Sequence, residues 1–234
     1  IKGIVSDPEL AEKLSPAHYY ATKRPIQDTC YFETFNRENV LLVDVKAEPI
    51  VEITPNGLLT TKAEYELDVI VFATGFDAMT GPLLKIDICG RNGVSLKEKW
   101  EDGARTKTYL GVANAGFPNM FMITGPESPS VISNMAVSIE QHVDWIADCI
   151  EYLRNQAVDT MEAEADAEHA WSAHCKEVAD STLLVQTDSW HMGANIEGKP
   201  RSLPIYLGGV GTYRQICDDI AAKGYGDFLL KNKR

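Results

Sequence analysis

Three short, largely apolar runs stand out before residue 125. They cover 39–45, 67–73 and 119–123. Apolar runs of this length are typical of strands that a parallel sheet buries on both faces. Two further runs, 49–53 and 58–60, flank Pro55-Asn56-Gly57, which predicts a β-hairpin turn. Nearer the start, Asp7-Pro8 predicts the first turn of a short helix.

Apolar residues at helical spacing dominate the rest of the chain. They predict helices over 134–155, 164–182 and 213–223. The last of these ends at Gly224, as helices commonly do. The expected core face of the first helix consists of Val137, Ile139, Val143, Ile146, Ile150 and Leu153. Residues 186–212 are rich in Gly, Pro and Ser, and we expect a long irregular segment there.

Two of the predicted strands stop abruptly at a turn of small residues that contains glycine. The turns are Thr74-Gly75-Phe76 and Thr124-Gly125-Pro126. Ligands bind at strand ends in open α/β sheets, and glycine lets the backbone approach a ligand closely. Thr74 and Gly75 are therefore candidate cofactor contacts.

Composition restricts the class of protein. With 22 Lys and Arg against 34 Asp and Glu, the net charge of −12 argues against a nucleic-acid partner, which needs a basic patch. No apolar run approaches the roughly 20 residues that cross a bilayer, so we expect no membrane span. The five cysteines form no CxxC pair, and the five histidines lack ligand spacing. We therefore expect reduced thiols in a cytoplasmic protein, and no metal site.

The segment Asp68-Val-Ile-Val-Phe-Ala-Thr-Gly-Phe-Asp77 is the most specific local motif. It resembles the strand that closes the nucleotide-binding domains of flavoprotein oxygenases. Other motifs follow in the order found in Baeyer–Villiger monooxygenases, with the greatest likeness to the phenylacetone and cyclohexanone monooxygenase group. They are Lys23-Arg24-Pro25, Tyr31–Val40, Leu96–Trp100, Tyr109–Gly111, Gly116–Asn119, Gly125–Pro129, Ser189-Trp190, Gly193–Asn195, Gly198–Pro200 and Tyr213-Arg214.

This resemblance implies a fold and an activity. The fold would be α/β: the C-terminal portion of a flavoprotein with two dinucleotide-binding domains, one for FAD and one for NADP, with a helical C-terminal segment. Residues 1–67 would end the NADP-binding domain, and 68–234 would form the C-terminal part of the FAD-binding domain. The whole enzyme would use NADPH and O₂ to insert one oxygen atom into a ketone through a C4a-peroxyflavin, giving an ester or lactone.

The resemblance also assigns roles to three side chains. Arg24 corresponds to the arginine that stabilises the peroxyflavin anion and its adduct with the ketone. A guanidinium suits that task because it stays charged at any working pH. Lys23 would contact the phosphate region of NADP, and Trp190 would donate a hydrogen bond to NADP from a closing loop. Without the resemblance, Arg24 is interpreted as a solvated loop charge and Trp190 as a loop residue on the core.

Residues 130–135 correspond to the family's loop beside the flavin ring and the substrate. Its candidate cofactor contacts are Ser133, Asn134 and Met135. The same segment also fits a helix N-terminus with Ser133 as the cap, and both interpretations are compatible.

Some of the family pattern is missing. The GxGxxG fingerprints for the two dinucleotides are absent, and the chain begins with Ile1. We therefore expect the C-terminal part of a protein roughly twice as long. Because its sheet edges would otherwise be uncovered, we expect this part to be ordered only beside the missing N-terminal half and to be inactive alone. Residues 105–108 are expected to form a loop longer than in the relatives.

Two alternatives stay open. An N- or S-oxygenating flavin monooxygenase would share the Ala73-Thr74-Gly75-Phe76 motif but would not need the Lys23-Arg24 pair. A truncated, non-catalytic module would account for the missing glycine loops.

Overall fold

A computed structural model describes residues 1–232 of the chain. The chain divides into two compact units. The first comprises residues 1–20 and 24–76, and the second comprises residues 21–23 and 77 onward.

The first unit contains two short helices and one small sheet. Helix α1 covers Pro8–Leu14, and Asp7 caps it by accepting the N–H groups of Glu9 and Leu10, which confirms the predicted start. Helix α2 covers Tyr31–Thr34. Strands β1 (Ile50–Thr54), β2 (Gly57–Thr60) and β3 (Glu64–Glu66) form an antiparallel sheet in that order. The predicted hairpin is therefore confirmed, and it carries a third strand.

The three predicted parallel strands are wrong. Residues 39–45, 67–73 and 119–123 are not in strands. A strand needs a neighbouring backbone to receive its hydrogen bonds, and the two sheets formed by the described residues provide none for these runs. Val71 and Phe72 are accordingly 82% and 73% exposed. The apolar pattern predicted buried strands, and among the described residues no strand pairs with these runs.

The second unit is mainly helical. Its helices are α3 (Gly81–Leu84), α4 (Leu96–Lys99), α5 (Met135–Asn155), α6 (Ala165–Asp180) and α7 (Val210–Ala222). Short 3₁₀ turns occur at η1 (Arg91–Gly93), η2 (Glu101–Gly103), η3 (Ser130–Ile132), η4 (Leu183–Gln186) and η5 (Trp190–Met192). Strands β4 (Thr160–Ala163) and β5 (Phe228–Lys231) pair antiparallel. All three helices predicted for this part are confirmed, and α7 begins three residues before the predicted start at 213.

The buried face of the long helix α5 agrees with the predicted one only at Ile146 and Leu153. Of the expected core positions, Val137, Ile139, Val143 and Ile150 are between 39% and 44% exposed. The buried positions are Ser138, Gln141, His142, Trp145, Ile146, Cys149 and Leu153. Polar side chains can lie on the inner face because they find partners there: the indole N–H of Trp145, for example, donates to the Cys217 carbonyl at 2.9 Å. Hydrophobic spacing alone gives no signal for such partners.

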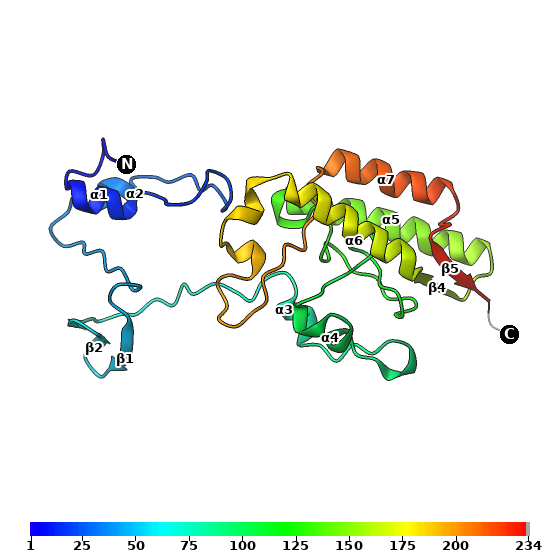
Figure 1. Ribbon diagram of the computed structural model, residues 1–234, viewed down its shortest axis with the longest axis horizontal. Coiled ribbons are helices and arrows are strands. Elements are labelled where there is room, and N and C mark those ends of the chain that lie inside the picture. The colour runs from blue at the N-terminus through cyan, green and yellow to red at the C-terminus, as the bar shows by residue number, and fades with distance from the viewer. Residues whose placement is uncertain (233–234) are drawn as a thin grey trace. The chain divides into compact units, whose positions relative to one another are not determined.

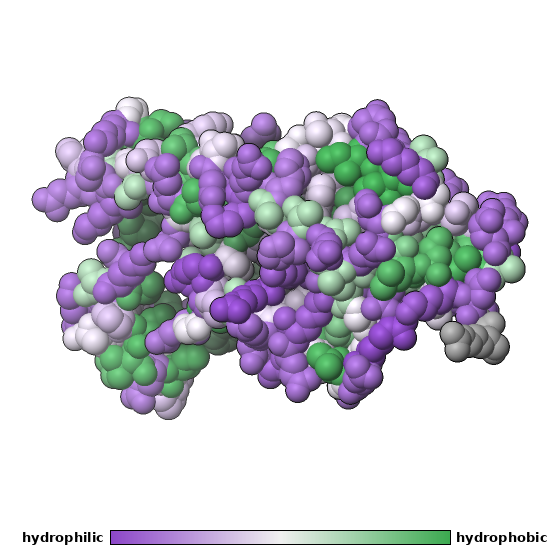
Figure 2. Space-filling model, turned by 45° about the vertical axis from the view of Figure 1, so that its right-hand side comes forward, coloured by the Kyte–Doolittle hydropathy of each residue, from purple (hydrophilic) through white to green (hydrophobic). Residues whose placement is uncertain are grey.

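The main core of the second unit lies among α5, α6 and α7 and the β4–β5 pair, which Figure 1 shows alongside one another. It is rich in aromatic rings, and the Trp145 ring contacts both Tyr225 and Phe228. A smaller core under α4 is built on Leu96, Trp100, Phe117 and Met122. Apolar patches also interrupt the polar surface of the molecule (Figure 2).

Candidate functional site

The connection from Thr124 to Ser130, which leads into α5, has an unusual backbone. Three non-glycine residues adopt positive φ: Thr124 at 51°, Glu127 at 65° and Ser130 at 41°. For a β-branched residue such as threonine this conformation is a genuine outlier. Strain of this kind persists only where surrounding contacts fix the backbone, and it gathers at functional sites. We call residues 124–130 the strained loop.

Contacts from several elements fix the strained loop. The Glu127 N–H donates to the Pro204 carbonyl at 2.8 Å, and the Tyr206 N–H donates to the Ser128 carbonyl at 2.9 Å. A Cβ added to Gly125 would lie 2.4 Å from the Gly111 carbonyl oxygen, so only glycine permits this approach. The backbone of the loop is thus tied to residues 204–206 and packed against residue 111.

A buried histidine ties the same loop to α5 and α7. The Thr124 N–H donates to Nδ1 of His142 at 2.7 Å, so Nδ1 carries no proton. Nε2 therefore carries the proton and donates to the Tyr213 hydroxyl at 2.8 Å, and that hydroxyl donates to the Leu110 carbonyl at 2.5 Å. Burial lowers the pKa of His142 to about 4, which keeps the ring neutral.

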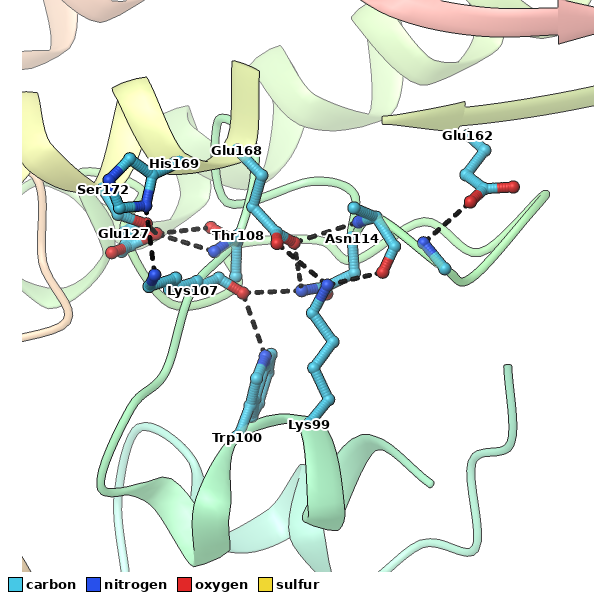
Figure 3. A network of polar contacts seen from close by, with 12 residues as sticks. Lys99, Trp100, Lys107, Thr108, Asn114, Glu127, Glu162, Glu168, His169 and Ser172 are labelled. Atoms are coloured by element: carbon cyan, nitrogen blue, oxygen red, sulfur yellow. Dashed lines mark hydrogen bonds and ion pairs between the residues drawn. The ribbon is translucent and has the colours of Figure 1, made fainter. Parts of the chain in front are cut away.

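The carboxyl group of Glu127 is held from α6 and from residue 108. Its Oε2 accepts the Thr108 N–H at 2.7 Å, the Thr108 hydroxyl at 3.2 Å and the Ser172 hydroxyl at 2.9 Å (Figure 3). The residue is only 5% exposed. Burial raises the pKa of Glu127 to about 7, although these donors favour the charged form and lower it. Glu127 is therefore poised to gain or lose a proton near neutral pH.

A second buried carboxylate organises the polar network of Figure 3. Glu168 of α6 accepts the Lys99 ammonium at 2.8 Å, the Asn114 amide at 3.1 Å and the Ala115 N–H at 2.9 Å. Lys99 also donates to the Ala115 carbonyl at 2.5 Å. The Trp100 indole N–H donates to the Lys107 carbonyl at 2.9 Å. This network connects α4, residues 107–115 and α6 to one another, and α6 in turn contacts Glu127 of the strained loop.

The predicted loop beside the flavin leads directly from the strained loop into α5. The cap of α5 is Asn134, whose Oδ1 accepts the Ala136 N–H at 3.1 Å, and the predicted cap, Ser133, is wrong. The Ser133 hydroxyl instead donates to the Ser130 carbonyl at 2.8 Å and lies 2.5 Å from the Ser138 hydroxyl. Ser133 and Met135 are half-buried, and Asn134 is exposed.

Trp190 lies in η5, inside the irregular segment predicted for 186–212. Its ring is half-buried and contacts the ring of His191, with centroids 4.0 Å apart. Lys199 fixes the same segment, because its ammonium contacts the Asp77 carboxylate and lies 3.2 Å from the Ala78 carbonyl. The segment is thus anchored although it is irregular.

The remaining candidates are exposed. Lys23 belongs to the second unit, whereas Arg24, Thr74 and Gly75 belong to the first. Within the second unit, Ser133, Asn134 and Trp190 make ordered contacts with neighbouring residues. The roles assigned to all these residues stay predictions.

Neither a metal-binding cluster nor a helix that could cross a membrane occurs in residues 1–232. Residues 1–232 contain no cluster of three or more His, Cys, Asp or Glu that could hold a metal ion. No helix in that part of the chain is long and apolar enough to cross a membrane.

Sequence reasoning missed the residues that carry the buried polar contacts. They are Glu127, His142, Glu168 and Tyr213. The inner face of α5 does show helical spacing, with a buried residue every three or four positions at Ser138, His142, Trp145 and Cys149. This spacing is visible in the sequence only when polar residues are accepted as core residues. Glu127 lies within the Gly125–Pro129 motif, but nothing in that motif indicates a buried carboxyl group.

Comparison with known proteins shows that the chain is similar in sequence to part of several monooxygenases. A Baeyer–Villiger monooxygenase from Pseudooceanicola batsensis is 46% identical over 230 residues, which make up 98% of this chain and 41% of that protein. A phenazine N-monooxygenase from Lysobacter antibioticus is 43% identical over 231 residues, 98% of this chain and 42% of that protein. No family model matches the chain.

The fold agrees with the sequence comparison. The crystal structure of OTEMO in complex with FAD and NADP superimposes with a TM-score of 0.92 at 38% identity, over 98% of this chain and 42% of that one. The mixed helical and sheet fold is thus similar to that of part of this FAD- and NADP-bound protein. The chain spans about two fifths of the length of the relatives it matches.

Proposed function

We propose that this chain, which corresponds to the C-terminal part of Baeyer–Villiger monooxygenases, serves in the intact protein to insert one oxygen atom from O₂ into a ketone. The product is an ester or lactone, and the cofactors are FAD and NADPH. One observation carries the proposal: identity of 46% extends over 98% of the chain. When bound, FAD reduced by NADPH supplies the activated oxygen.

The proposal divides the chain as the resemblance does, with 1–67 ending an NADP-binding domain and 68–234 belonging to an FAD-binding domain. The rest of both domains belongs to an N-terminal half that the relatives' lengths indicate. Three of the five free cysteines are buried, which supports the assignment to the reducing cytoplasm.

The chemistry of the exposed candidates fits these cofactors. Lys23 and Arg24 present two neighbouring cations to solvent, and anionic phosphates and oxyanions need such groups. We assign Lys23 to NADP, and Arg24 to NADP and to the negative charge that develops on the ketone oxygen. The capped N-terminus of α5 adds a favourable dipole beside Ser133, Asn134 and Met135.

Trp190, Thr74 and Gly75 are assigned to contacts with the dinucleotides and to the exclusion of water. Trp190 combines a half-buried ring with one N–H donor, which suits a residue that covers NADP and excludes water. Thr74 and Gly75 are assigned to backbone contacts with a dinucleotide, because glycine with a φ of 79° leaves room for close approach.

The decisive experiment uses the intact protein, NADPH, O₂ and a panel of ketones, with mass spectrometry of the products. We expect esters or lactones, and we expect Arg24→Ala to lower their rate of formation by about 10²-fold or more, since it removes a donor to a developing oxyanion. Arg24→Lys should restore part of the rate. Arg154→Ala, which removes an exposed arginine at the end of α5, is the matched control. Unchanged ester formation in Arg24→Ala would overturn the role of Arg24.

N-oxygenation is the second candidate function, because the phenazine N-monooxygenase is nearly as similar to the chain as the Baeyer–Villiger enzyme. Phenazines belong in the same substrate panel. An N-oxide formed without any ester would favour this alternative and exclude the first.

A further inference from the structure

A cavity of about 450 Å³ opens beside the strained loop in the second unit. This volume lies within the roughly 300–1,000 Å³ typical of small-molecule sites. Residues 104–107, α6 and residues 201–204 surround it. None of the residues assigned above to FAD, NADP or the ketone lines it. Binding of a ligand in this cavity therefore does not depend on the proposed oxygenation.

One end of the cavity is formed by the carboxyl group of Glu127. Figure 3 shows that all the donors to this group meet one oxygen, Oε2, while Oε1 points away from them. Among the described residues Oε1 has no hydrogen-bond partner, and Glu127 lines the cavity. A polar atom of a residue that is 95% buried thus remains available to a molecule in the cavity.

Cations gather around the same cavity. Its lining includes Arg105, Lys107, Lys176 and Arg201, against the acidic groups of Glu127 and Asp180. This excess is notable in a chain whose net charge is −12, and it focuses a positive potential on the cavity.

The present partners of these cations are largely exposed ones. Arg105 pairs with Glu101 at 3.2 Å, with side chains 72% and 53% exposed, and Lys176 pairs with Asp180, with side chains 74% and 54% exposed. Exposed pairs contribute little free energy. An anionic ligand can therefore replace them at small cost.

The remaining wall is apolar. Cys175 and Ala179 of α6, Val185, Met192 and Leu203 contribute to it. An inorganic anion would leave this wall in contact with water, whereas an organic anion would cover it. The lining thus combines four cations, the carboxyl group of Glu127 and several apolar side chains. This combination fits a ligand with one anionic group and a short hydrocarbon body.

We propose that the cavity binds a small organic carboxylate. The carboxylate of the ligand accepts the proton of Glu127 Oε1 in a hydrogen bond and faces the cations of the lining, while its hydrocarbon part lies against the apolar wall. No covalent bond forms. The ligand is held only when Glu127 is protonated, because two carboxylates in contact repel each other.

Proton dependence follows from the environment of Glu127. Its pKa is raised to about 7, mainly by burial and to a smaller extent by the negative charge of Glu168. The charged groups that line the cavity around it are Arg105, Lys107, Lys176, Asp180 and Arg201. Because a bound carboxylate also favours the protonated form, we expect binding and proton uptake to be coupled.

The test is calorimetric titration of the intact protein with hexanoate from about pH 6 to about pH 9, where hexanoate stays ionised. The dissociation constant of the wild type should rise about tenfold per pH unit above the pKa of Glu127. Hexanamide, which has the same hydrocarbon part but no charge, should bind at least about tenfold more weakly at the lowest pH.

Two variants make the test specific. In Glu127→Gln one amide atom keeps the contact with the Thr108 N–H, and the NH₂ group donates to the ligand at every pH, so its affinity for hexanoate should not depend on pH. Lys176→Gln should weaken binding about two- to fivefold, since it removes an exposed charge that lines the site. Lys97→Gln removes a similarly exposed lysine outside the cavity and should have no effect.

The proposal is overturned if hexanoate does not bind at the lowest pH, or if hexanamide binds equally well. It is also overturned if the affinity of the wild type is independent of pH. Binding that Glu127→Gln and Lys176→Gln leave unchanged would place hexanoate elsewhere on the protein.

Discussion

Replacing Glu127 with glutamine should stabilise the protein above neutral pH. The side chain is 5% exposed, and burial raises its pKa from 4.5 to about 7. In the unfolded chain the carboxyl group ionises freely in water. The folded state must instead keep the proton or bury a charge, and this difference in proton binding sets the pH dependence of stability.

The direction and size of the effect follow from the two pKa values. Below pH 4.5 both states are protonated, and Glu127 contributes its full stabilisation. As the pH rises from 4.5 to about 7 the unfolded state loses its proton first, so stability falls. One pKa unit corresponds to about 1.4 kcal/mol, so the complete loss is about 3 kcal/mol. Glutamine has the same shape and does not ionise, and it avoids this loss.

Urea titration of the intact protein at about pH 5 and about pH 8.5 measures the effect. Glu127→Gln and wild type should differ little at the lower pH, and the variant should be more stable by up to about 3 kcal/mol at the higher pH. Glu177→Gln is the matched control, since it removes the same charge from an exposed position of α6. A difference between Glu127→Gln and wild type that is the same at both pH values would refute the reasoning.

Two further predictions concern the buried polar contacts. Replacing His142 with phenylalanine keeps an aromatic ring but leaves the Thr124 N–H without an acceptor and the Tyr213 hydroxyl without its donor. The free energy of unfolding at neutral pH should therefore fall by about 2 kcal/mol in urea titration, whereas equal stability would contradict the assigned contacts. Lys99→Met leaves the buried carboxylate of Glu168 without its cation and should cost about 3 kcal/mol. The double variant Lys99→Met with Glu168→Gln should recover part of that loss, and no recovery would show that the pair does not interact.

Local signals predicted the elements that are stabilised locally. Asp7 caps α1, the turn at Pro55 and Asn56 joins β1 to β2, and Gly224 follows α7 with a φ of 71°. In each case a few neighbouring residues determine the backbone, so the sequence pattern is sufficient.

Elements that depend on distant partners were predicted less well. Residues 67–73 have the composition of a buried strand, but a strand forms only where another backbone pairs with it. The inner face of α5 was misjudged because His142 is buried through contacts with residues 124 and 213, far away in sequence. The roles of Arg24 and Trp190 came from family resemblance alone, since neither side chain carries a distinctive local pattern.

The strained loop is fixed by two ionisable side chains, His142 and Glu127, in which burial favours the neutral form, and their effects on stability oppose each other. Burial lowers the pKa of His142 from 6.5 to about 4, so stability falls as the pH drops through this range, because the unfolded state binds the proton first. Glu127 acts in the opposite direction between pH 4.5 and about 7. Each effect amounts to about 3 kcal/mol, and between pH 4.5 and 6.5 they cancel. These two groups therefore leave the stability of the wild type nearly flat in this window, whereas in Glu127→Gln the His142 effect is uncompensated and stability must rise with pH.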